Sequence, residues 1–384
     1  MEFGIFNSGC LLPGYRPGDA LREHHRMIDE VEWTIAADRA GFKYTWATEH
    51  HFLEEYSHLS ANEVFLGYLA AATERMHIGS GIFNITPPVN APARIAERVA
   101  MLDHLSGGRF EFGMGRGSST TEQAGFGITD PESTRDMFDE VIEQFKYMWR
   151  PGEYAGHDGT FFSMPPRNVL PKPLTNPHPP MWVAAGSPPT FEKAARMGLG
   201  VLCFTTASLE ALKPLIETYK RNIEHAEPVG EYVNNNVMVT SQMLCLEDGQ
   251  RVRDIMAGLQ GGYHSSLLFK YLDTFPRPEG VPTWPDLIPE ATPEQIDMMI
   301  RSRTQCIGTP EDVEVATQKY ADAGVDQLVF GMLSTTMSRD IAIEAVENFG
   351  RHIIPKFDTD PVHSTTRQRE AQGFGALAVS GDRT

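Results

Sequence analysis

Residues 49–52, Glu49-His50-His51-Phe52, place an acid and two imidazoles at the end of an apolar, β-like run. Strand ends of this kind carry the chemistry in barrel enzymes. Because successive side chains of extended backbone point to opposite faces, only one of the two histidines can look into a site. An imidazole exchanges protons near neutral pH, although a single histidine can equally be a hydrogen-bonded structural residue. The motif is therefore a candidate for proton transfer.

A glycine-rich segment, Phe112-Gly113-Met114-Gly115-Arg116-Gly117, follows another predicted strand. Its glycines would let backbone amides approach a ligand closely, but their spacing is not that of a dinucleotide-binding fingerprint. Arg116 is the informative residue, because a guanidinium is a fixed two-point donor to a phosphate or carboxylate. The alternative is an ordinary surface arginine in a turn.

Two further segments include strand ends. In residues 183–192, Gly186, Ser187 and Thr190 lie where a helix begins, so the hydroxyls either cap the helix or help its free amides to hold an anion. The other segment, 78–83, contains Ser80-Gly81-Ile82 and is unusually small for a strand end. It indicates either a close backbone approach to a flat ligand or a simple bulge.

The elements that carry these residues alternate between short apolar runs and longer amphipathic stretches. Eight runs of this kind predict an α/β fold, a (β/α)8 TIM barrel, in a single domain over residues 1–357. Insertions are expected at 150–180, which is rich in proline, and at 258–300, whose aromatic residues suit a lid. Residues 358–384 are polar and aperiodic, and they predict a flexible tail. The predicted strands are 2–7, 43–48, 77–83, 109–114, 181–185, 200–204, 236–245 and 326–332.

The composition of the chain limits the classes of partner that we expect it to bind. The chain has 384 residues and a net charge of −18, which disfavours nucleic acid and anionic membranes. Its four cysteines show no zinc spacing, and no basic leader or transmembrane-length apolar stretch is evident. His-x-His or spaced carboxylate ligands are also not evident, which argues against a metal hydrolase. We therefore expect no metal and a cytoplasmic location.

Taken together, these motifs resemble the bacterial luciferase-like monooxygenase family, the flavin-dependent enzymes that include the luciferase α subunit. The likeness covers roughly residues 1–355 and is strongest in 49–52, 102–117, 186–195 and 308–311. It implies a barrel that binds reduced FMN at its C-terminal face, where dioxygen gives a flavin C4a-peroxide. An imidazole could stabilise this anion or pass it a proton.

The resemblance also implies roles for single residues. His50 matches the family's catalytic histidine, and Glu49 is expected to tune or orient its ring. Arg116 and Arg135 match phosphate donors, and the 186–190 turn, through Gly186, Ser187 and Thr190, is expected to complete the phosphate site. Ser80-Gly81-Ile82 matches the segment beneath the flavin ring, where a cis peptide is expected at Gly81-Ile82.

The resemblance has limits. Luciferases carry a reactive cysteine where this chain has Gly115 and a tyrosine near the position of Ser119, so light emission is not inferred. We expect oxygenation of a small apolar molecule, with reduced FMN delivered by a separate flavin reductase in transient contact. There are two alternatives: a relative that uses the deazaflavin F420, and a non-catalytic flavin-binding partner subunit. Small and apolar residues in 61–73 and 91–105 suit either packing on the barrel or the dimer face that the family uses, and we expect a homodimer.

Overall fold

Eight parallel strands close into a barrel in the computed structural model, which describes residues 1–16, 18–204, 208–331 and 333–375. The ring closes because β12 pairs with β1 and β10, and β10 also pairs with β9. The fold prediction is thereby confirmed, and the described part of each predicted strand overlaps an observed one. The barrel strands are β1 (Glu2–Asn7), β2 (Tyr44–Ala47), β3 (His77–Ser80), β5 (Phe110–Gly115), β8 (Met181–Ala184), β9 (Gly200–Cys203), β10 (Val237–Cys245) and β12 (Gln327–Gly331).

Two short strands extend this ring. The predicted strand 77–83 ends early, at Ser80, and the chain resumes pairing as β4 (Phe83–Asn84) along β5. The second, β11 (Cys306–Gly308), pairs with the end of β10 and was not predicted. Both lie towards the C-terminal end of the barrel strand with which they pair.

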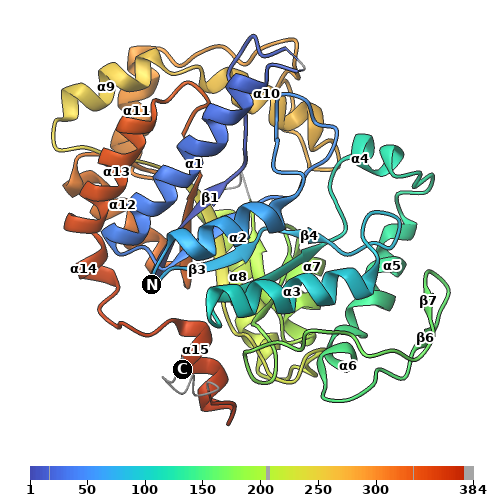
Figure 1. Cartoon of the computed structure of the whole chain (residues 1–384). Coiled ribbons are helices and arrows are strands. Elements are labelled where there is room, and N and C mark those ends of the chain that lie inside the picture. The colour runs from blue at the N-terminus through green and yellow to red at the C-terminus, as the bar shows by residue number, and fades with distance from the viewer. Residues whose placement is uncertain (17, 205–207, 332, 376–384) are drawn as a thin grey trace.

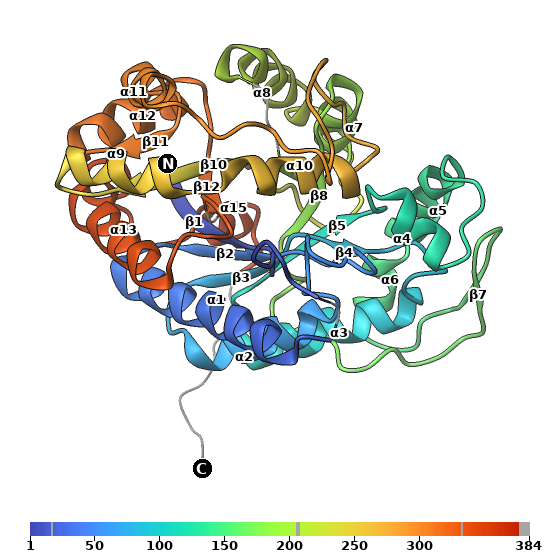
Figure 2. The ribbon, with the colours of Figure 1, turned by 90° about the horizontal axis from the view of Figure 1, so that it is seen from above.

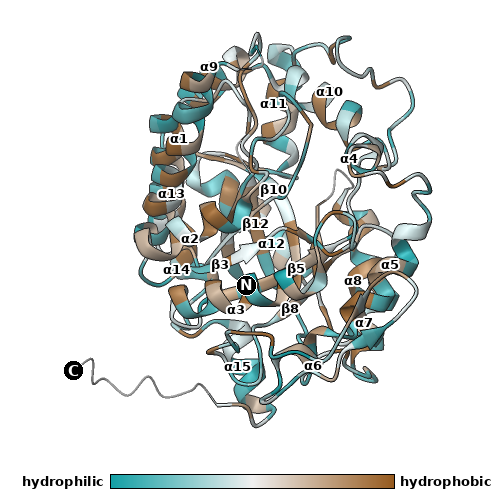
Figure 3. Ribbon diagram, turned by 45° about the vertical axis from the view of Figure 1, so that its right-hand side comes forward, coloured by the Kyte–Doolittle hydropathy of each residue, from teal (hydrophilic) through white to brown (hydrophobic). Residues whose placement is uncertain are grey.

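Helices surround the strands (Figures 1 and 2). They cover the barrel with one face, and Figure 3 shows both apolar and polar residues along α1 and α13. Glycines in the left-handed conformation end two of them, α1 at Gly41 and α3 at Gly107. The helices placed around the barrel include α1 (Ala20–Ala40), α2 (Asn62–Ala72), α3 (Pro92–Ser106), α4 (Thr120–Gly125), α5 (Ser133–Ile142), α6 (Phe145–Trp149), α7 (Pro188–Arg196), α8 (Leu209–Ile223), α12 (Pro310–Asp322) and α13 (Arg339–His352).

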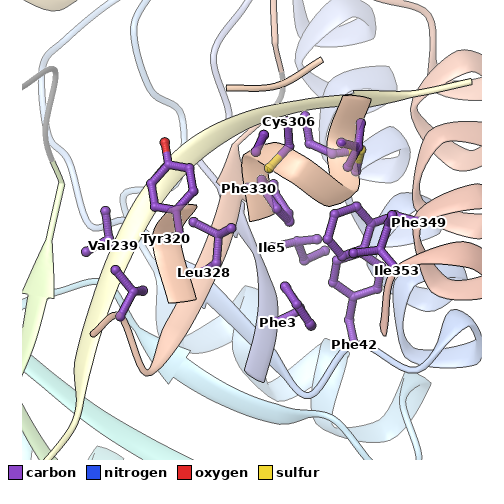
Figure 4. Close-up of a cluster of buried hydrophobic side chains, with 14 of the residues drawn as sticks. Phe3, Ile5, Phe42, Val239, Cys306, Tyr320, Leu328, Phe330, Phe349 and Ile353 are labelled. Atoms are coloured by element: carbon purple, nitrogen blue, oxygen red, sulfur yellow. The ribbon is translucent and has the colours of Figure 1, made fainter. Parts of the chain in front are cut away.

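The main core lies between the strands and these helices (Figure 4). On β1, Phe3 and Ile5 point outwards, and the ring of Phe3 lies 5.0 Å from that of Phe349 on α13. Gly4 and Phe6 occupy the alternate positions, because strand side chains alternate between faces. Phe6 belongs to a separate cluster inside the barrel.

Two indole rings are among the side chains that fill the interior of the barrel, together with Tyr44, Leu202, Met238 and Val329. Trp46 on β2 and Trp182 on β8 are fully buried and meet edge to face, with ring centroids 5.3 Å apart. Each ring fills the space beside a glycine of a neighbouring strand, since a Cβ atom at Gly79 or at Gly200 would lie 2.4 Å from indole carbons. Because the interior is packed, a ligand can bind only at an end of the barrel and not within it.

The N-terminal end of the barrel is closed by the C-terminal part of the chain. After α14 (Ile354–Phe357), the chain forms α15 (Ser364–Ala371), whose Thr365 and Arg369 are buried. Thr365 donates a hydrogen bond of 2.7 Å to the buried carboxyl group of Glu111, and Ser364 donates one of 2.6 Å to Glu2. The predicted flexible tail is therefore wrong for residues 358–375, because buried carboxyl groups accept hydrogen bonds from this polar helix. Residues 376–384 lie outside the described part of the chain.

Both insertions are ordered. The first forms a small hairpin of β6 (His157–Asp158) and β7 (Ser163–Met164). The second contains α10 (Gly261–Tyr271) and α11 (Pro293–Ser302), and it follows α9 (Gly249–Gly258). In Figure 1, α10 lies at the opposite end of the molecule from α15. Within the described ranges, no helix combines the length and apolar character that crossing a membrane requires.

Candidate functional site

His50 follows β2 at the C-terminal end of the barrel and is paired with a carboxylate. Its Nδ1 lies 3.2 Å from Oε2 and 3.3 Å from Oε1 of Glu122, on the short helix α4. The same carboxylate accepts the backbone N–H of His51 at 2.7 Å, and Glu122 is only 6% exposed. Because a carboxylate can only accept, His50 must carry its proton on Nδ1 when neutral. Nε2 is then the atom available to exchange a proton.

Glu49 holds the other histidine. Its Oε1 lies 3.1 Å from Nε2 of His51 and accepts a hydrogen bond of 2.8 Å from Asn90, while its Oε2 accepts the Asn84 N–H at 3.3 Å. The ring that Glu49 orients is therefore that of His51 rather than that of His50. The sequence reasoning missed Glu122, which lies 72 residues from His50. The signal that could have singled it out is an acid within the Ser/Thr-rich segment directly after the glycine-rich strand end.

The two predicted phosphate donors lie close together. Arg116 leaves the end of β5, and its Nη1 donates to Thr134 Oγ1 at 2.8 Å. Burial lowers the pKa of Arg116, and the positive charge of Arg135 lowers it further, whereas Glu132 opposes this. Arg135, in the first turn of α5, is mostly exposed and lies 3.2 Å from Glu132. Two guanidinium groups held near each other favour a ligand with two negative charges.

The 186–190 turn is a helix cap. Thr190 Oγ1 accepts the backbone N–H groups of Gly186 and Ser187, at 3.2 and 3.0 Å, and lies 3.1 Å from Ser187 Oγ. This arrangement is the capping alternative considered from the sequence, and the exposed hydroxyls remain compatible with an anion. An ion pair between Lys193 on α7 and Asp139 on α5, at 2.6 Å, places this helix beside the one that carries Arg135.

The small segment Ser80-Gly81-Ile82, which begins with the last residue of β3, lies at the C-terminal end of the barrel. The buried hydroxyl of Ser80 donates to the carbonyl of Gly113 at 2.8 Å and accepts its N–H at 2.9 Å, so this side chain joins two strands. The Gly81–Ile82 peptide bond is cis, as the resemblance implied. Gly81 and Ile82 are partly exposed, unlike Ser80. They are the members of the segment that can face a ligand.

The 258–300 insertion covers this end of the barrel. Tyr271 on α10 donates to Glu55 Oε2 at 2.6 Å, in the segment after β2, and Thr274 donates to the Ser118 carbonyl at 2.7 Å, after β5. Asp273 accepts the Thr120 N–H at 2.9 Å. These contacts support the prediction that the segment is a roof over the strand ends. Surface hollows also occur elsewhere, beside α9 and α13 and on the β6–β7 hairpin.

The fit of a flavin can be judged from the space and polar groups that the opening offers. A Cβ atom at Gly331 would meet no atom within 4 Å, so the end of β12 leaves open space beside Phe6, its partner on β1. On and before α4, the Ser119 hydroxyl and the Gln123 amide are buried without a hydrogen-bond partner among the described residues. Free space, unpaired polar groups and two guanidinium groups at one rim fit a flat, phosphorylated cofactor. The described residues contain no cluster of histidine, cysteine, aspartate and glutamate that could hold a metal ion.

Comparison with known proteins agrees with this geometry. A family model described as luciferase-like monooxygenase matches residues 1–327. The chain is 32% identical over 179 residues to the oxygenase component of the flavin-dependent trigonelline monooxygenase of Acinetobacter baylyi, covering 46% of this chain and 48% of that protein. It is 25% identical over 324 residues to the F420-dependent glucose-6-phosphate dehydrogenase of Kineococcus radiotolerans, covering 80% and 88%.

The fold comparison agrees as well. The crystal structure of monooxygenase RslO1 from Streptomyces bottropensis matches with a TM-score of 0.72 at 24% identity, over 92% of this chain and 99% of that one, which shows a shared fold. The chain spans about half the length of the first curated relatives that it matches. Flavin-dependent monooxygenases and F420-dependent enzymes both occur among its relatives. The chain therefore belongs to the luciferase-like monooxygenase family.

Proposed function

We propose that this protein is the oxygenase component of a two-component monooxygenase, which uses reduced FMN and dioxygen to oxygenate a small apolar molecule. One observation carries the proposal: a single segment, residues 116–135, contains Arg116, Glu122 and Arg135, and Glu122 ties this segment to His50 across the opening. An imidazole and two guanidinium groups therefore belong to one rim of the barrel. A flavin phosphate and a reacting ring would need this combination of charges.

Each group then has a defined task. Arg116 and Arg135 would hold the phosphate, with Gly186, Ser187 and Thr190 beside it, and Gly81 and Ile82 would lie against the ring. Bound reduced FMN would supply the electrons that activate dioxygen. Nε2 of His50 would hold or deliver a proton there, because Glu122 fixes the opposite nitrogen as the donor. The roof would exclude water.

The cofactor can be identified by titration without oxygen. Equilibrium dialysis of the purified protein against FMNH2 and against reduced F420 should show tighter binding of FMNH2. An F420-dependent family member would use the same barrel. Tighter binding of F420 would therefore indicate an enzyme that transfers hydride, and it would contradict the monooxygenase proposal. Arg116→Ala should weaken FMNH2 binding more than binding of reduced riboflavin, which lacks the phosphate. The matched control is Arg94→Ala, an exposed arginine on α3.

The role of His50 can be tested by oxygen consumption coupled to substrate oxygenation. His50→Ala should lower the rate of oxygenation by roughly 10²- to 10⁴-fold, the usual contribution of a proton-transferring group. Glu122→Gln should lower it less, since the ring remains while its tautomer is no longer fixed. His51→Ala is the control, because its ring is held by Glu49. Unchanged turnover in His50→Ala would favour a non-catalytic flavin-binding subunit.

We also propose a homodimer, a transient flavin reductase partner and a cytoplasmic location. Of the small residues in 61–73 and 91–105, Ala70, Ala96 and Ala100 are buried, whereas Ala71 is exposed. Large apolar residues on the same two helices are exposed instead: Val64, Tyr68, Met101 and Leu105. The four cysteines are buried and unpaired, as suits a reducing compartment. Light scattering should give a dimer mass, and Tyr68→Asp combined with Leu105→Asp should give a monomer mass.

A further inference from the structure

Glu122 lies on a helix that is too short to be stable by itself. α4 has only six residues, whereas isolated helices shorter than about 12 residues are marginal in water. Its N-cap residue, Ser119, forms no side-chain capping hydrogen bond, and within the described part of the chain the buried Ser119 hydroxyl has no partner. The position of Glu122, and with it the contact to His50, therefore depends on what holds α4 from outside.

The roof supplies the cap that α4 lacks. Asp273, which follows the end of α10, accepts the Thr120 N–H at 2.9 Å with Oδ1, and its Oδ2 accepts the Thr120 hydroxyl. The next residue, Thr274, donates its hydroxyl to the Ser118 carbonyl at 2.7 Å and its backbone N–H to the same oxygen at 3.3 Å. A carboxylate at the first turn of a helix is also favoured by the helix dipole. The first turn of α4 is thus held by the roof.

The same short stretch of the roof also contacts the segment that carries His50. Tyr271, the last residue of α10, donates to Glu55 at 2.6 Å. The buried Tyr56 ring contacts both sides, since its centroid lies 5.6 Å from that of His50 and 6.3 Å from that of Tyr271. A second ring of α10, His264, stacks on Tyr56 with centroids 6.2 Å apart. Residues 271–274 therefore join the two segments that meet in the His50–Glu122 pair.

The remaining contacts of α4 are less directional. A Cβ atom at Gly125 would lie 2.5 Å from the ring of Phe52, which is itself 56% exposed, and the Phe126 ring lies 4.9 Å from that of His51. Ring packing keeps the helix close to the 49–52 segment, but it does not determine the angle and length of a hydrogen bond. N–H···O hydrogen bonds span about 2.7–3.2 Å, and Nδ1 of His50 already lies 3.2 Å from the carboxylate. A small shift of α4 would therefore break the pair.

We infer that roof residues 271–274 are positioning residues, which hold the His50–Glu122 pair in hydrogen-bonding geometry. This inference rests on the proposed function, in which Nε2 of His50 exchanges a proton because Glu122 keeps the other proton on Nδ1. Where the roof does not hold α4, His50 keeps its ring but loses the partner that selects one tautomer. The roof therefore controls the proton chemistry of the rim in addition to excluding water.

The test is nitrogen-15 NMR of the full-length protein without cofactor, labelled at the histidine ring nitrogens and recorded at pH 8.0, where an ordinary imidazole is neutral. The His50 signals are identified by their loss in His50→Ala. We expect the wild type to show one tautomer, with the proton on Nδ1, and Asp273→Ala to show a mixture of both. Asp273→Asn should restore the single tautomer, because an amide oxygen still accepts the Thr120 N–H. Asp286→Ala, an exposed aspartate elsewhere in the roof, is the matched control and should match the wild type.

A second measurement reports on the position of α4 itself. Hydrogen exchange followed by mass spectrometry should be about fivefold faster in residues 118–126 of Asp273→Ala, the usual effect of replacing a helix-capping side chain by alanine. Tyr271→Phe, which keeps the ring but removes the hydroxyl that donates to Glu55, should instead accelerate exchange in residues 53–58. In turnover, both variants should lower kcat by no more than Glu122→Gln does and leave KM unchanged, because they disturb proton transfer and not substrate binding.

The outcomes separate this inference from the proposed function. A single tautomer in Asp273→Ala, or a mixture already in the wild type, would overturn the positioning role. If the tautomer of His50 changes as expected but the protein takes up no FMNH2, the positioning role stands and the monooxygenase proposal fails. If FMNH2 binds and substrate is oxygenated while the tautomer is the same in all variants, the opposite holds. Thermal unfolding of each variant checks folding, and Thr274→Val, which removes the hydroxyl that donates to Ser118, should also accelerate exchange in residues 118–126 and replaces Asp273→Ala if that variant does not fold.

Discussion

Glu111 should make the stability of the protein depend on pH above neutrality. This carboxyl is fully buried at the closed end of the barrel, where it contacts His77 at 2.7 Å, Trp182 at 2.7 Å and Thr365 at 2.7 Å. Burial raises its pKa from 4.5 to about 8, although the hydrogen bonds from Thr365 and Trp182 oppose this. The folded protein therefore keeps a proton on Glu111 that the unfolded chain releases. Stability is lost as the pH rises towards 8.

The size of the effect follows from the proton count. Burial lowers the pKa of His77 from 6.5 to about 3, so above pH 6.5 this ring is neutral in both the folded and the unfolded state. Of these two groups, only Glu111 then contributes a proton difference, which is close to one at pH 6.5 and falls to one half at its pKa of about 8. At about 1.4 kcal/mol per pH unit, this amounts to about 2 kcal/mol of unfolding free energy. Below pH 6.5, His77 has the opposite effect, because the unfolded chain takes up a proton that the folded protein does not. Its contribution to the unfolding free energy therefore increases as the pH rises towards 6.5.

The assay is urea unfolding followed by far-UV circular dichroism at pH 6.5, 7.0, 7.5 and 8.0. In Glu111→Gln, the neutral amide cannot release a proton, so the decline across this range should be about 2 kcal/mol smaller than in the wild type. Glu344→Gln, an exposed glutamate paired with Arg251, should retain the decline of the wild type. The same slope in Glu111→Gln and in the wild type would refute the reasoning.

Two further predictions concern the packing of the barrel. Gly79→Ala should lower the unfolding free energy by about 1–3 kcal/mol, because its Cβ atom would lie 2.4 Å from the Trp46 ring. Gly258→Ala, with free space at the end of a helix, should not destabilise the protein. Calorimetric melting of both variants checks this. Thr365→Val should lower the unfolding free energy by about 1–2 kcal/mol at pH 6.5. It should also extend the loss of stability to higher pH, because Glu111 loses a hydrogen-bond donor to its ionised form and its pKa rises further. Urea midpoints equal to those of the wild type at all four pH values would contradict this prediction.

The barrel could be predicted from the sequence because each strand is an apolar run bounded by breakers. Buried parallel strands have this pattern on both faces, and the helices between them end at residues such as Gly41 and Gly107 in the left-handed conformation. The position of His50 followed from the same reasoning, since strand ends meet at one rim. The position of its partner Glu122 could not be predicted in this way, because a contact between residues 72 positions apart depends on how two loops are arranged at the rim.

The C-terminal helix shows a different limit. Residues 364–371, STTRQREA, contain no apolar stripe, so hydrophobic periodicity gives no reason to expect burial. Their burial depends on Glu2 and Glu111, two carboxyl groups inside the barrel whose oxygens accept hydrogen bonds from this helix. Because a carboxylate in a strand is normally expected to face solvent, the sequence does not show that such partners are required. Polar burial of this kind can be recognised only once the barrel is assembled.

The indole layer inside the barrel gives the protein a built-in optical reporter. Trp46 and Trp182 are fully buried, and the Trp46 N–H has no partner among the described residues, so their emission should lie at the short-wavelength end for tryptophan. Tryptophan emits at wavelengths that flavins absorb. A flavin bound directly above this layer would therefore quench the emission by energy transfer, and cofactor uptake could be followed in the unmodified protein without attaching a label.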